Sequence, residues 1–314
     1  MKKVLLLLNM GGPSNLDEVA VFLKNMFNDK YIISVKNNLL RKFIAYMIVN
    51  GRKNIAKKNY EAIGGKSPIC DITQSLVNKL KNSDYEVDFI MNYTPPFAKD
   101  VLNKYNDADE FILFPLYPHH SVTTISSSLD DVKNTMKELG LKQKITEIPY
   151  FYENEIYNDV ILNLILRKIS SKNLDPKDFI LIFSAHSLPI KIIKNGDLYE
   201  EHIKKHVEIL KNKLKENDIF FKDIKLAYQS KLGPVEWLGP NIVDVMKKLN
   251  HKKVIVFPIA FCIDNSETVF EIDIEYRKLA KELNYEFFDV VSCPNDSDEF
   301  AKFIDIRTRN TFCL

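Results

Sequence analysis

The chain has 314 residues, of which 46% are hydrophobic and 27% are charged, and its formal net charge is +2. This length suffices for two ordinary domains, and the near-neutral charge gives no reason to expect a nucleic-acid partner. Four scattered cysteines form no C-x-x-C pair: Cys70, Cys262, Cys293 and Cys313. Their spacing argues against a zinc finger or a disulfide scaffold and fits a reducing compartment.

Met1 is followed by two lysines and a short apolar run, as in a signal peptide. The run is too short, however, and Gly11-Gly12-Pro13 follows where a small-residue cleavage site would stand. No apolar run approaches the ~18 residues that a membrane-spanning helix needs. We therefore expect a soluble, cytoplasmic protein.

Short apolar runs alternate with amphipathic segments along the whole chain. In the first half the expected strands are Val4–Leu8, Val87–Met91, Glu110–Leu116 and Lys144–Ile148, and the expected helices are Leu16–Met26, Ile72–Leu80 and Leu129–Leu139. In the second half the strands are Phe179–Phe183, Lys225–Tyr228, Val254–Phe257 and Phe287–Val290, and the helices are Tyr157–Ser170, Tyr199–Leu214 and Ile242–Leu249. This alternation predicts an α/β fold with parallel, doubly wound sheets in two similar lobes joined near Pro149–Glu155.

The segment Asn38–Tyr60 differs from the other helical segments because it mixes apolar and basic side chains. Leu39, Phe43 and Tyr46 stand among Arg41, Lys42 and further lysines. A basic amphipathic helix can lie on a membrane surface or cover an apolar cleft. The alternative is an ordinary surface helix packed on the first lobe.

A row of acidic residues follows the expected strand Val254–Phe257. After a turn at Asp264-Asn265-Ser266, Glu267, Glu271 and Glu275 recur at i, i+4 and i+8, so they share one side of a helix. The opposite side, predicted to face the core, carries Val269, Ile272, Tyr276 and Leu279.

Two structural explanations compete with a functional one for these acids. Asp264 and Glu267 fit a helix cap with its reciprocal acid, and acids opposite an apolar face are usually solvated. Three like charges repel, however, by roughly 0.2–0.5 kcal/mol per adjacent pair, and Lys278 offsets only part of that. The row also begins where open α/β sheets place their ligand crevice, which favours the functional explanation.

Polar or Gly/Pro-rich turns also follow several of the other expected strands. These turns lie in Asn9–Pro13, Pro115–Thr124, Ser184–Pro189 and Tyr228–Pro240, the last of which holds the single tryptophan. A similar segment, Tyr60–Pro68, follows the basic apolar segment. Neither a G-x-G-x-x-G nor a Walker A sequence is present, and the G-x-S-x-G elbow of serine hydrolases is absent. A lone histidine is more often structural, but His186 at one strand end and Glu267 beyond another could form an incomplete divalent-metal site.

Taken together, these stretches resemble the ferrochelatase family, lyases that insert ferrous iron into protoporphyrin at the end of haem synthesis. The resemblance runs from Leu5 to about Asn295. It rests on Phe183-Ser-Ala-His186-Ser-Leu-Pro189, on Tyr228-Gln-Ser-Lys-x-Gly-Pro-x-x-Trp237-Leu-Gly-Pro240 and on Asp264-x-x-Glu267-Thr-x-x-Glu271-x-Asp273-x-Glu275-Tyr276. The three motifs occur in the family's order.

The resemblance implies two Rossmann-like lobes with a porphyrin cleft between them. The first would comprise residues 1–150 with 293–314 returning to it, and the second, residues 151–292, would carry His186 and Glu267. These two would be catalytic residues and metal ligands on one side of the macrocycle. The other walls would include Met10, Tyr93, Tyr117, Ser121 and Thr123, with Trp237 beside the ring.

The chemistry of metal insertion explains these residue types. Two pyrrole protons must leave as Fe²⁺ enters, and His186 can accept a proton or hold the metal. Stacked carboxylates raise one another's pKa, which makes Glu271 and Glu275 candidate proton relays beyond Glu267.

This chain departs from the family at two positions. Most members have His where Asn265 stands, and many have Arg where Asn92 stands; Asn cannot titrate near neutral pH as His does.

Related activities fit the same motifs: a coproporphyrin ferrochelatase, a cobalt chelatase, or a non-catalytic tetrapyrrole or metal carrier. A carrier would need a closed site with several metal ligands. We expect no organic cofactor, with Fe²⁺ and protoporphyrin IX as substrates and a monomer or weak dimer as the active form. We also expect no iron–sulfur cluster, because only Cys313 lies in the C-terminal tail and clusters usually need four thiolates.

Overall fold

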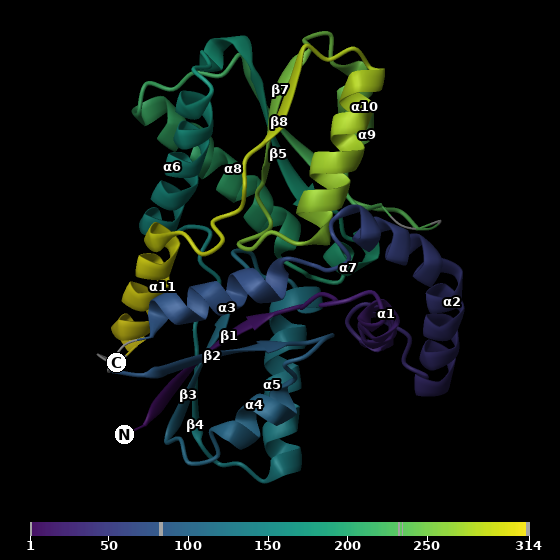
Figure 1. Cartoon of the computed structure of the whole chain (residues 1–314), viewed down its shortest axis with the longest axis vertical. Helices are drawn as coiled ribbons and strands as arrows, with labels where there is room; N and C mark the ends of the chain where they lie inside the picture. Colours follow the sequence, from purple (N-terminus) through teal and green to yellow (C-terminus); the bar gives the residue numbers. More distant parts are fainter. Residues whose placement is uncertain (1, 82–83, 232, 234, 312–314) are drawn as a thin grey trace. The chain divides into compact units, whose positions relative to one another are not determined.

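The computed structural model describes residues 2–81, 84–231, 233 and 235–311. It divides into two compact units (Figure 1). The first comprises Met1–Tyr117, Ser121–Tyr150 and Asp296–Leu314, and the second comprises Pro118–His120 and Phe151–Asn295. The division expected from the sequence does not anticipate that Pro118–His120 belongs to the second unit.

The first unit contains a four-stranded, all-parallel sheet in the order β2-β1-β3-β4. Its strands are β1 (Lys3–Asn9), β2 (Glu86–Met91), β3 (Glu110–Pro115) and β4 (Lys144–Glu147). Its helices are α1 (Glu18–Asn28), α2 (Asn38–Ala62), α3 (Ile69–Leu80), α4 (Ala98–Lys104), α5 (Ser127–Leu139) and α11 (Asp298–Asn310).

Both faces of this sheet are buried, which explains why β1 reads as an uninterrupted apolar run. Alternate residues of β1 and β3, such as Leu6 and Leu113, pack in one cluster with Val101 of α4 and Val132 of α5. On the opposite face, Phe114 of β3 meets Phe303 of α11, with ring centroids 6.2 Å apart. The segment expected to return to the first lobe is therefore a helix that packs against its sheet.

The second unit repeats this arrangement with a parallel sheet in the order β6-β5-β7-β8. Its strands are β5 (Ile180–His186), β6 (Asp223–Gln229), β7 (Lys253–Pro258) and β8 (Phe287–Val290). Its helices are α6 (Glu155–Ser171), the 3₁₀ turn η2 (Pro176–Asp178), α7 (Ile190–Lys194), α8 (Tyr199–Glu216), α9 (Ile242–Lys248) and α10 (Tyr276–Glu282). All eight predicted strands and the α/β class are confirmed.

A π-helix follows the corresponding strand of each sheet: η1 (Val122–Ser126) comes after β3 and η3 (Glu267–Glu275) after β7. The π-helix closes i→i+5 hydrogen bonds and occurs frequently at functional sites. The acidic row therefore lies on π-helical backbone. Of its predicted core face, Ile272 and Tyr276 are buried, whereas Val269 and Leu279 are only partly covered.

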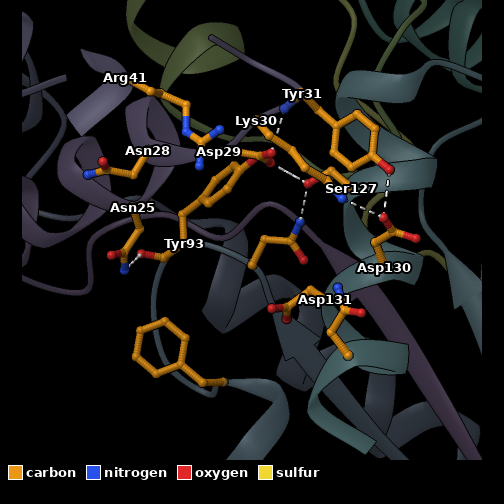
Figure 2. A pocket seen from close by; sticks show the side chains of 13 residues that line it. Asn25, Asn28, Asp29, Lys30, Tyr31, Arg41, Tyr93, Ser127, Asp130 and Asp131 are labelled. Carbon is orange, nitrogen blue, oxygen red and sulfur yellow. Dashed lines mark hydrogen bonds and ion pairs between the residues drawn. The ribbon is translucent and has the colours of Figure 1, made fainter. Parts of the chain in front are cut away.

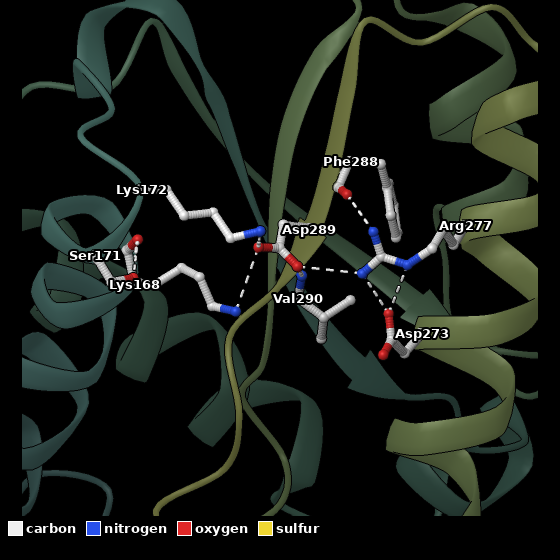
Figure 3. Close-up of polar contacts among 8 residues, drawn as sticks. All are labelled: Lys168, Ser171, Lys172, Asp273, Arg277, Phe288, Asp289 and Val290. Atoms are coloured by element: carbon white, nitrogen blue, oxygen red, sulfur yellow. Dashed lines mark hydrogen bonds and ion pairs between the residues drawn. The ribbon is translucent and has the colours of Figure 1, made fainter. Parts of the chain in front are cut away.

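A group of charged side chains fastens η3 and α10 to the edge strand β8 (Figure 3). Asp289 of β8 is buried and accepts Lys172 Nζ at 2.8 Å and Arg277 Nη2 at 3.1 Å. Arg277 also donates to Asp273 of η3 at 2.5 Å. Burial opposes ionisation of Asp289, but these cations and the Val290 N–H outweigh it and lower its pKa to about 2. The carboxylate thus stays charged and holds the helix that carries the acidic row.

The helix α2 leaves much of its apolar surface in solvent. Within it only Ala45 and Tyr60 are buried, whereas Leu39, Phe43 and Tyr46 are 79%, 62% and 64% exposed. None of the helices in the described part of the chain is long and apolar enough to cross a membrane.

Candidate active site

The candidate site of the second unit is built where β5, β6 and β7 end. β5 lies between β6 and β7 in the sheet, so the strands that follow it in sequence lie on both of its sides. Open α/β sheets bind ligands at the carboxyl ends of strands around such a reversal. β5 ends at His186, Ser230 follows β6, and the segment after β7 leads to Glu267.

His186 and Glu267, 81 residues apart in sequence, form a hydrogen-bonded pair. Nδ1 of the imidazole lies 2.7 Å from Oε2 of the carboxylate, and the two side chains are 32% and 25% exposed. No other hydrogen bond within the described ranges reaches the imidazole nitrogens. Nε2 therefore remains open to a ligand, while the carboxylate fixes the ring.

Each member of this pair alters the ionisation of the other. Burial lowers the pKa of His186, but the charge and hydrogen bond of Glu267 outweigh it and raise that pKa above its ordinary value. Burial likewise raises the pKa of Glu267, and His186 more than compensates, so the Glu267 pKa lies below its ordinary value. A carboxylate thus stands ready to stabilise an imidazolium.

Ser230 connects this pair to the next carboxylate of the row. Its Oγ lies 3.3 Å from Oε2 of Glu267 and also donates to Oε2 of Glu271 through a short hydrogen bond. Its backbone N–H donates to Oε1 of Glu271 at 2.8 Å. The hydroxyl of Tyr276 is a further donor to Glu271, at 2.6 Å. Glu271 is therefore held by specific donors, which the solvated-face explanation does not predict.

Ser230 was not predicted as a site residue, although it lies in the segment Tyr228–Pro240 singled out from the sequence. The available signal was its position, the first residue after a strand that borders the one ending at His186. Tyr276 was assigned only to the core, and its hydroxyl contact with Glu271 was also missed.

The cap predicted between Asp264 and Glu267 does not form. Asp264 instead accepts the side-chain amide of Asn295 at 2.6 Å. Buried Asn265 takes over the turn, because its Oδ1 accepts the Glu267 N–H at 2.8 Å. This leaves the carboxylate of Glu267 free to meet His186. It also gives Asn265 a structural role that needs no titratable group.

Glu275 lies at the far end of the row and is exposed. Partial burial and the charge of Glu271 raise its pKa, and Lys278 only partly opposes them. Within the described ranges its carboxylate has no hydrogen-bond or ion-pair partner. The structure therefore joins His186, Glu267 and Glu271 directly, and leaves Glu275 as the solvent end.

Trp237 is half-buried beside the segment that follows His186. It pairs with Pro189 in an isolated antiparallel bridge, and Leu238 N–H donates to the Leu188 carbonyl at 3.0 Å. The tryptophan and histidine motifs therefore meet in the second unit.

In the first unit, the predicted residues Met10 and Tyr93 lie together. Tyr93 N–H donates to the Met10 carbonyl at 3.0 Å. The Tyr93 hydroxyl donates to Asp29 at 2.7 Å, and Ser127 donates to the same oxygen at 2.5 Å. Burial raises the pKa of Tyr93 well above its ordinary value, so this tyrosine is a donor and not a base.

Tyr93, Asp29 and Ser127 line an open pocket of about 520 Å³ within the first unit, and Met10 is not among its lining residues (Figure 2). The pocket also holds Arg41, Asn92 and two further aspartates, Asp130 and Asp131. Of these, Asn92 was singled out from the sequence beside Tyr93, and Arg41 only as part of the basic segment. Burial, with the charges of Asp29 and Glu138, raises the pKa of Asp131 to about 6. Asn92 donates to Ser127 Oγ at 3.0 Å, so it supports the Tyr93 network without carrying charge.

The three other predicted ring contacts, Tyr117, Ser121 and Thr123, are buried. Ser121 caps η1 by accepting the Thr123 N–H at 3.2 Å, and the two hydroxyl oxygens lie 2.9 Å apart. In the structure the hydroxyls of Ser121 and Thr123 therefore hold the start of the π-helix.

No group of three or more His, Cys, Asp or Glu side chains in the described part of the chain is arranged to hold a metal ion. The assignment of His186 and Glu267 as metal ligands stays a prediction.

The two parallel sheets and the His–Glu site at a strand reversal define a doubly wound α/β protein with a candidate site at the carboxyl ends of its strands. A solved structure of SirB from Bacillus subtilis with Fe³⁺ has this fold, with a TM-score of 0.55, 9% identity and coverage of 99% of this chain and 96% of that one. A ferrochelatase from Campylobacter concisus is 56% identical over 313 residues, covering 99% of this chain and 98% of that protein. One from Campylobacter fetus is 52% identical over 313 residues, covering 98% and 99%. Residues 2–311 match the profile of the family described as Ferrochelatase, and the chain belongs to that family.

Proposed function

We propose that this chain inserts Fe²⁺ into protoporphyrin IX, forming protohaem and releasing two protons in the last step of haem biosynthesis. The observation that carries the proposal is the His186–Glu267 pair, whose carboxylate is linked through Ser230 to Glu271. Such a pair can remove protons from a ring, and a row of acids can conduct them away. The enzyme would be a lyase that acts in the cytoplasm as a monomer or weak dimer.

The geometry suggests how the protons leave. Neutral His186 would donate Nδ1–H to Glu267 and present the Nε2 lone pair to a pyrrole N–H. The imidazolium formed by proton transfer would be stabilised by the adjacent carboxylate, as in other histidine–carboxylate pairs. Glu267 and then Glu271 would return His186 to its neutral form for the second proton.

Iron is a substrate in this reaction and must be released into the ring. His186 Nε2 and the Glu267 carboxylate are the ligands we propose for it before transfer. Two protein ligands make an incomplete site, from which a metal can pass on. Met10, Tyr93, Tyr117 and Trp237 would supply apolar and aromatic contacts to the porphyrin.

We propose that the enzyme carries no iron–sulfur cluster. Cluster ligands are thiolates. Burial raises the pKa of Cys262, to about 12, and that of Cys293, while Cys70 lies in the other unit. Cys313 lies outside the described residues. Visible cluster absorption together with stoichiometric sulfide in the purified protein would contradict this proposal.

The exposed side chains of α2 support a peripheral contact with anionic lipid. Its apolar surface (Leu39, Phe43, Tyr46) is interleaved with lysines and arginines, which anionic headgroups attract. Binding to anionic vesicles should weaken with salt, because ions screen the basic side chains. Equal partitioning onto neutral and anionic vesicles would remove the electrostatic basis of this contact.

The test of the function is anaerobic incubation of the purified protein with Fe²⁺ and either protoporphyrin or coproporphyrin, followed by absorbance. We expect metallation of protoporphyrin by the native chain. His186→Ala should abolish turnover while circular dichroism stays unchanged, since a partly exposed strand-end residue leaves no large core cavity. Metallation of neither porphyrin would overturn the proposal, and a preference for coproporphyrin would reassign the substrate.

A further inference from the structure

Ser230 has an unusual backbone conformation for its residue type. Its φ of 64° lies in the left-handed region, which residues other than glycine seldom adopt. Strained backbone persists where the surrounding structure enforces it, and it is concentrated at functional sites. Here the conformation aims both the N–H and the hydroxyl of one residue at the acidic row.

The two carboxylates that Ser230 contacts carry like charges on one side of η3. Its backbone N–H contacts one oxygen of Glu271, and its hydroxyl contacts the other oxygen and Glu267 Oε2. A serine hydroxyl has one hydrogen and can donate it to only one of these carboxylates at a time. The shorter contact is to Glu271, so Glu267 keeps the longer one at 3.3 Å. The hydroxyl thus contacts both carboxylates, and in the part of the chain that the structure describes no hydrogen bond joins the two carboxylates directly.

We infer that Ser230 is a positioning residue that holds Glu267 and Glu271 in one connected arrangement behind His186. The inference rests on the proposed function. Without the hydroxyl, the repulsion between the carboxylates favours their separation, and the path from Glu267 to Glu271 is broken. Ser230 would then affect the chemical step and leave porphyrin binding unchanged.

The experiment compares Ser230→Ala, Ser230→Gly and Tyr276→Phe in anaerobic metallation assays over a range of pH. Ala keeps the strained backbone without the hydroxyl, whereas Gly also removes the strain. Tyr276→Phe is the matched control, because it removes another hydroxyl from Glu271 without touching Glu267. We expect kcat to fall about 10- to 100-fold in both Ser230 variants, as for other residues that orient reacting groups.

Three readouts separate positioning from a general structural effect. The porphyrin KM should stay within about twofold, Gly should be more stable than Ala at this position, and the two variants should nevertheless lose the same activity. Tyr276→Phe should lose less activity than either Ser230 variant, because the Ser230 hydroxyl still contacts both Glu267 and Glu271. If the native chain metallates porphyrin but both Ser230 variants keep native kcat at every pH, the inference is wrong. It is also wrong if KM rises as much as kcat falls. Failure of the native chain to metallate would instead overturn the proposed function.

Discussion

Glu267 and Glu271 show how neighbouring carboxylates can be tolerated on one helix side. Glu267 gains a cationic partner in His186, and Glu271 gains three donors from Ser230 and Tyr276. Hydrogen bonds and opposite charge favour the ionised forms. At the solvent end, burial and the charge of Glu271 raise the pKa of Glu275, which suits a group that releases protons to water.

The His186–Glu267 pair should stabilise the fold over a limited pH range. The His186 pKa is raised above its ordinary 6.5, so its contribution is complete below 6.5 and is lost as pH rises through the folded value. The Glu267 pKa is lowered below its ordinary 4.5, so its contribution is lost as pH falls through the folded value. Stabilisation is therefore greatest between about pH 4.5 and 6.5.

Glu267→Gln removes this stabilisation while keeping the size of the side chain. We expect the free energy of unfolding in urea to fall by on the order of 1 kcal/mol at pH 5.5, a modest value because the pair is partly exposed. At pH 9 the loss should be smaller, because the raised His186 pKa no longer contributes there. Glu275→Gln, the same change on the same helix, should have little effect. If the free energy of unfolding falls equally at both pH values, the effect comes from packing and not from charge.

The pairing of His186 with Glu267 could be anticipated from the sequence because the first ends a buried strand and the second lies on the helix that follows another strand of the same sheet. The sequence could not show that Ser230 has a left-handed backbone, which is not a property of serine, nor that Asn265 and not Asp264 accepts the Glu267 N–H. Those choices depend on partners such as Asn295 that are distant in sequence.

Among the elements, α6 and α8 are joined to Pro118–His120 by a buried chain of neutral side chains. Nε2 of His119 lies 2.8 Å from Nδ1 of His206, whose Nε2 lies 2.8 Å from Oδ1 of Asn158. The Asn158 amide donates to the Tyr152 and Asn154 carbonyls, so its oxygen must accept. His206 therefore carries its hydrogen on Nε2, and His119 donates to Nδ1 of His206.

This buried network of hydrogen-bonded histidines should make the stability of the fold sensitive to acid. Burial lowers the pKa of His206 to about 3, so the unfolded chain binds more protons than the folded chain below pH 6.5. Stability should then fall by roughly 1.4 kcal/mol per pH unit for each such histidine. His206→Gln can preserve both hydrogen bonds without titrating. Between pH 6 and pH 5 we expect a smaller loss of unfolding free energy in this variant than in the native chain. An identical loss in the two proteins would contradict the conclusion that His206 is neutral in the folded state.

Hydrophobic and charge periodicity did not reveal that the acidic row lies on a π-helix. The i, i+4, i+8 spacing of the glutamates suits one helix side in either geometry, so it does not distinguish a π-helix from an α-helix. The helix α11 was also missed as an element, because it lies in the segment that was assigned to the first lobe only by resemblance.

At the scale of the whole molecule, both sheets have the same strand order and a π-helix after the corresponding strand. The strands were predictable because parallel strands buried on both faces are nearly continuous apolar runs. The order of the strands in each sheet was not predictable, since an apolar run does not show which strands lie beside it. Yet that order places the ends of β5, β6 and β7 side by side, where His186, Ser230 and the segment leading to Glu267 begin.

The packing of α11 against the first unit should contribute to the free energy of unfolding. Phe303 is fully buried against Phe114 and Phe300, with ring centroids 6.2 Å and 5.9 Å away. Phe303→Ala should cost about 3–5 kcal/mol of unfolding free energy, measured in urea. Lys302→Ala, an exposed position on the same helix, should change it by less than about 0.5 kcal/mol. Similar small losses in both variants would contradict the role of α11 in this core.

The position of α11 in the chain also sets an order of events on the ribosome. Its partners in the first unit, among them Ser75, Lys79 and Tyr85, are translated early, whereas Asp296, Asp298 and Asp305 emerge only after the second unit. The nascent first unit must therefore wait with the apolar side chains around Phe114 uncovered while the second unit is made. A premature stop codon before Asp296 would leave that surface permanently open, and the truncated product would be a substrate for chaperones and proteases.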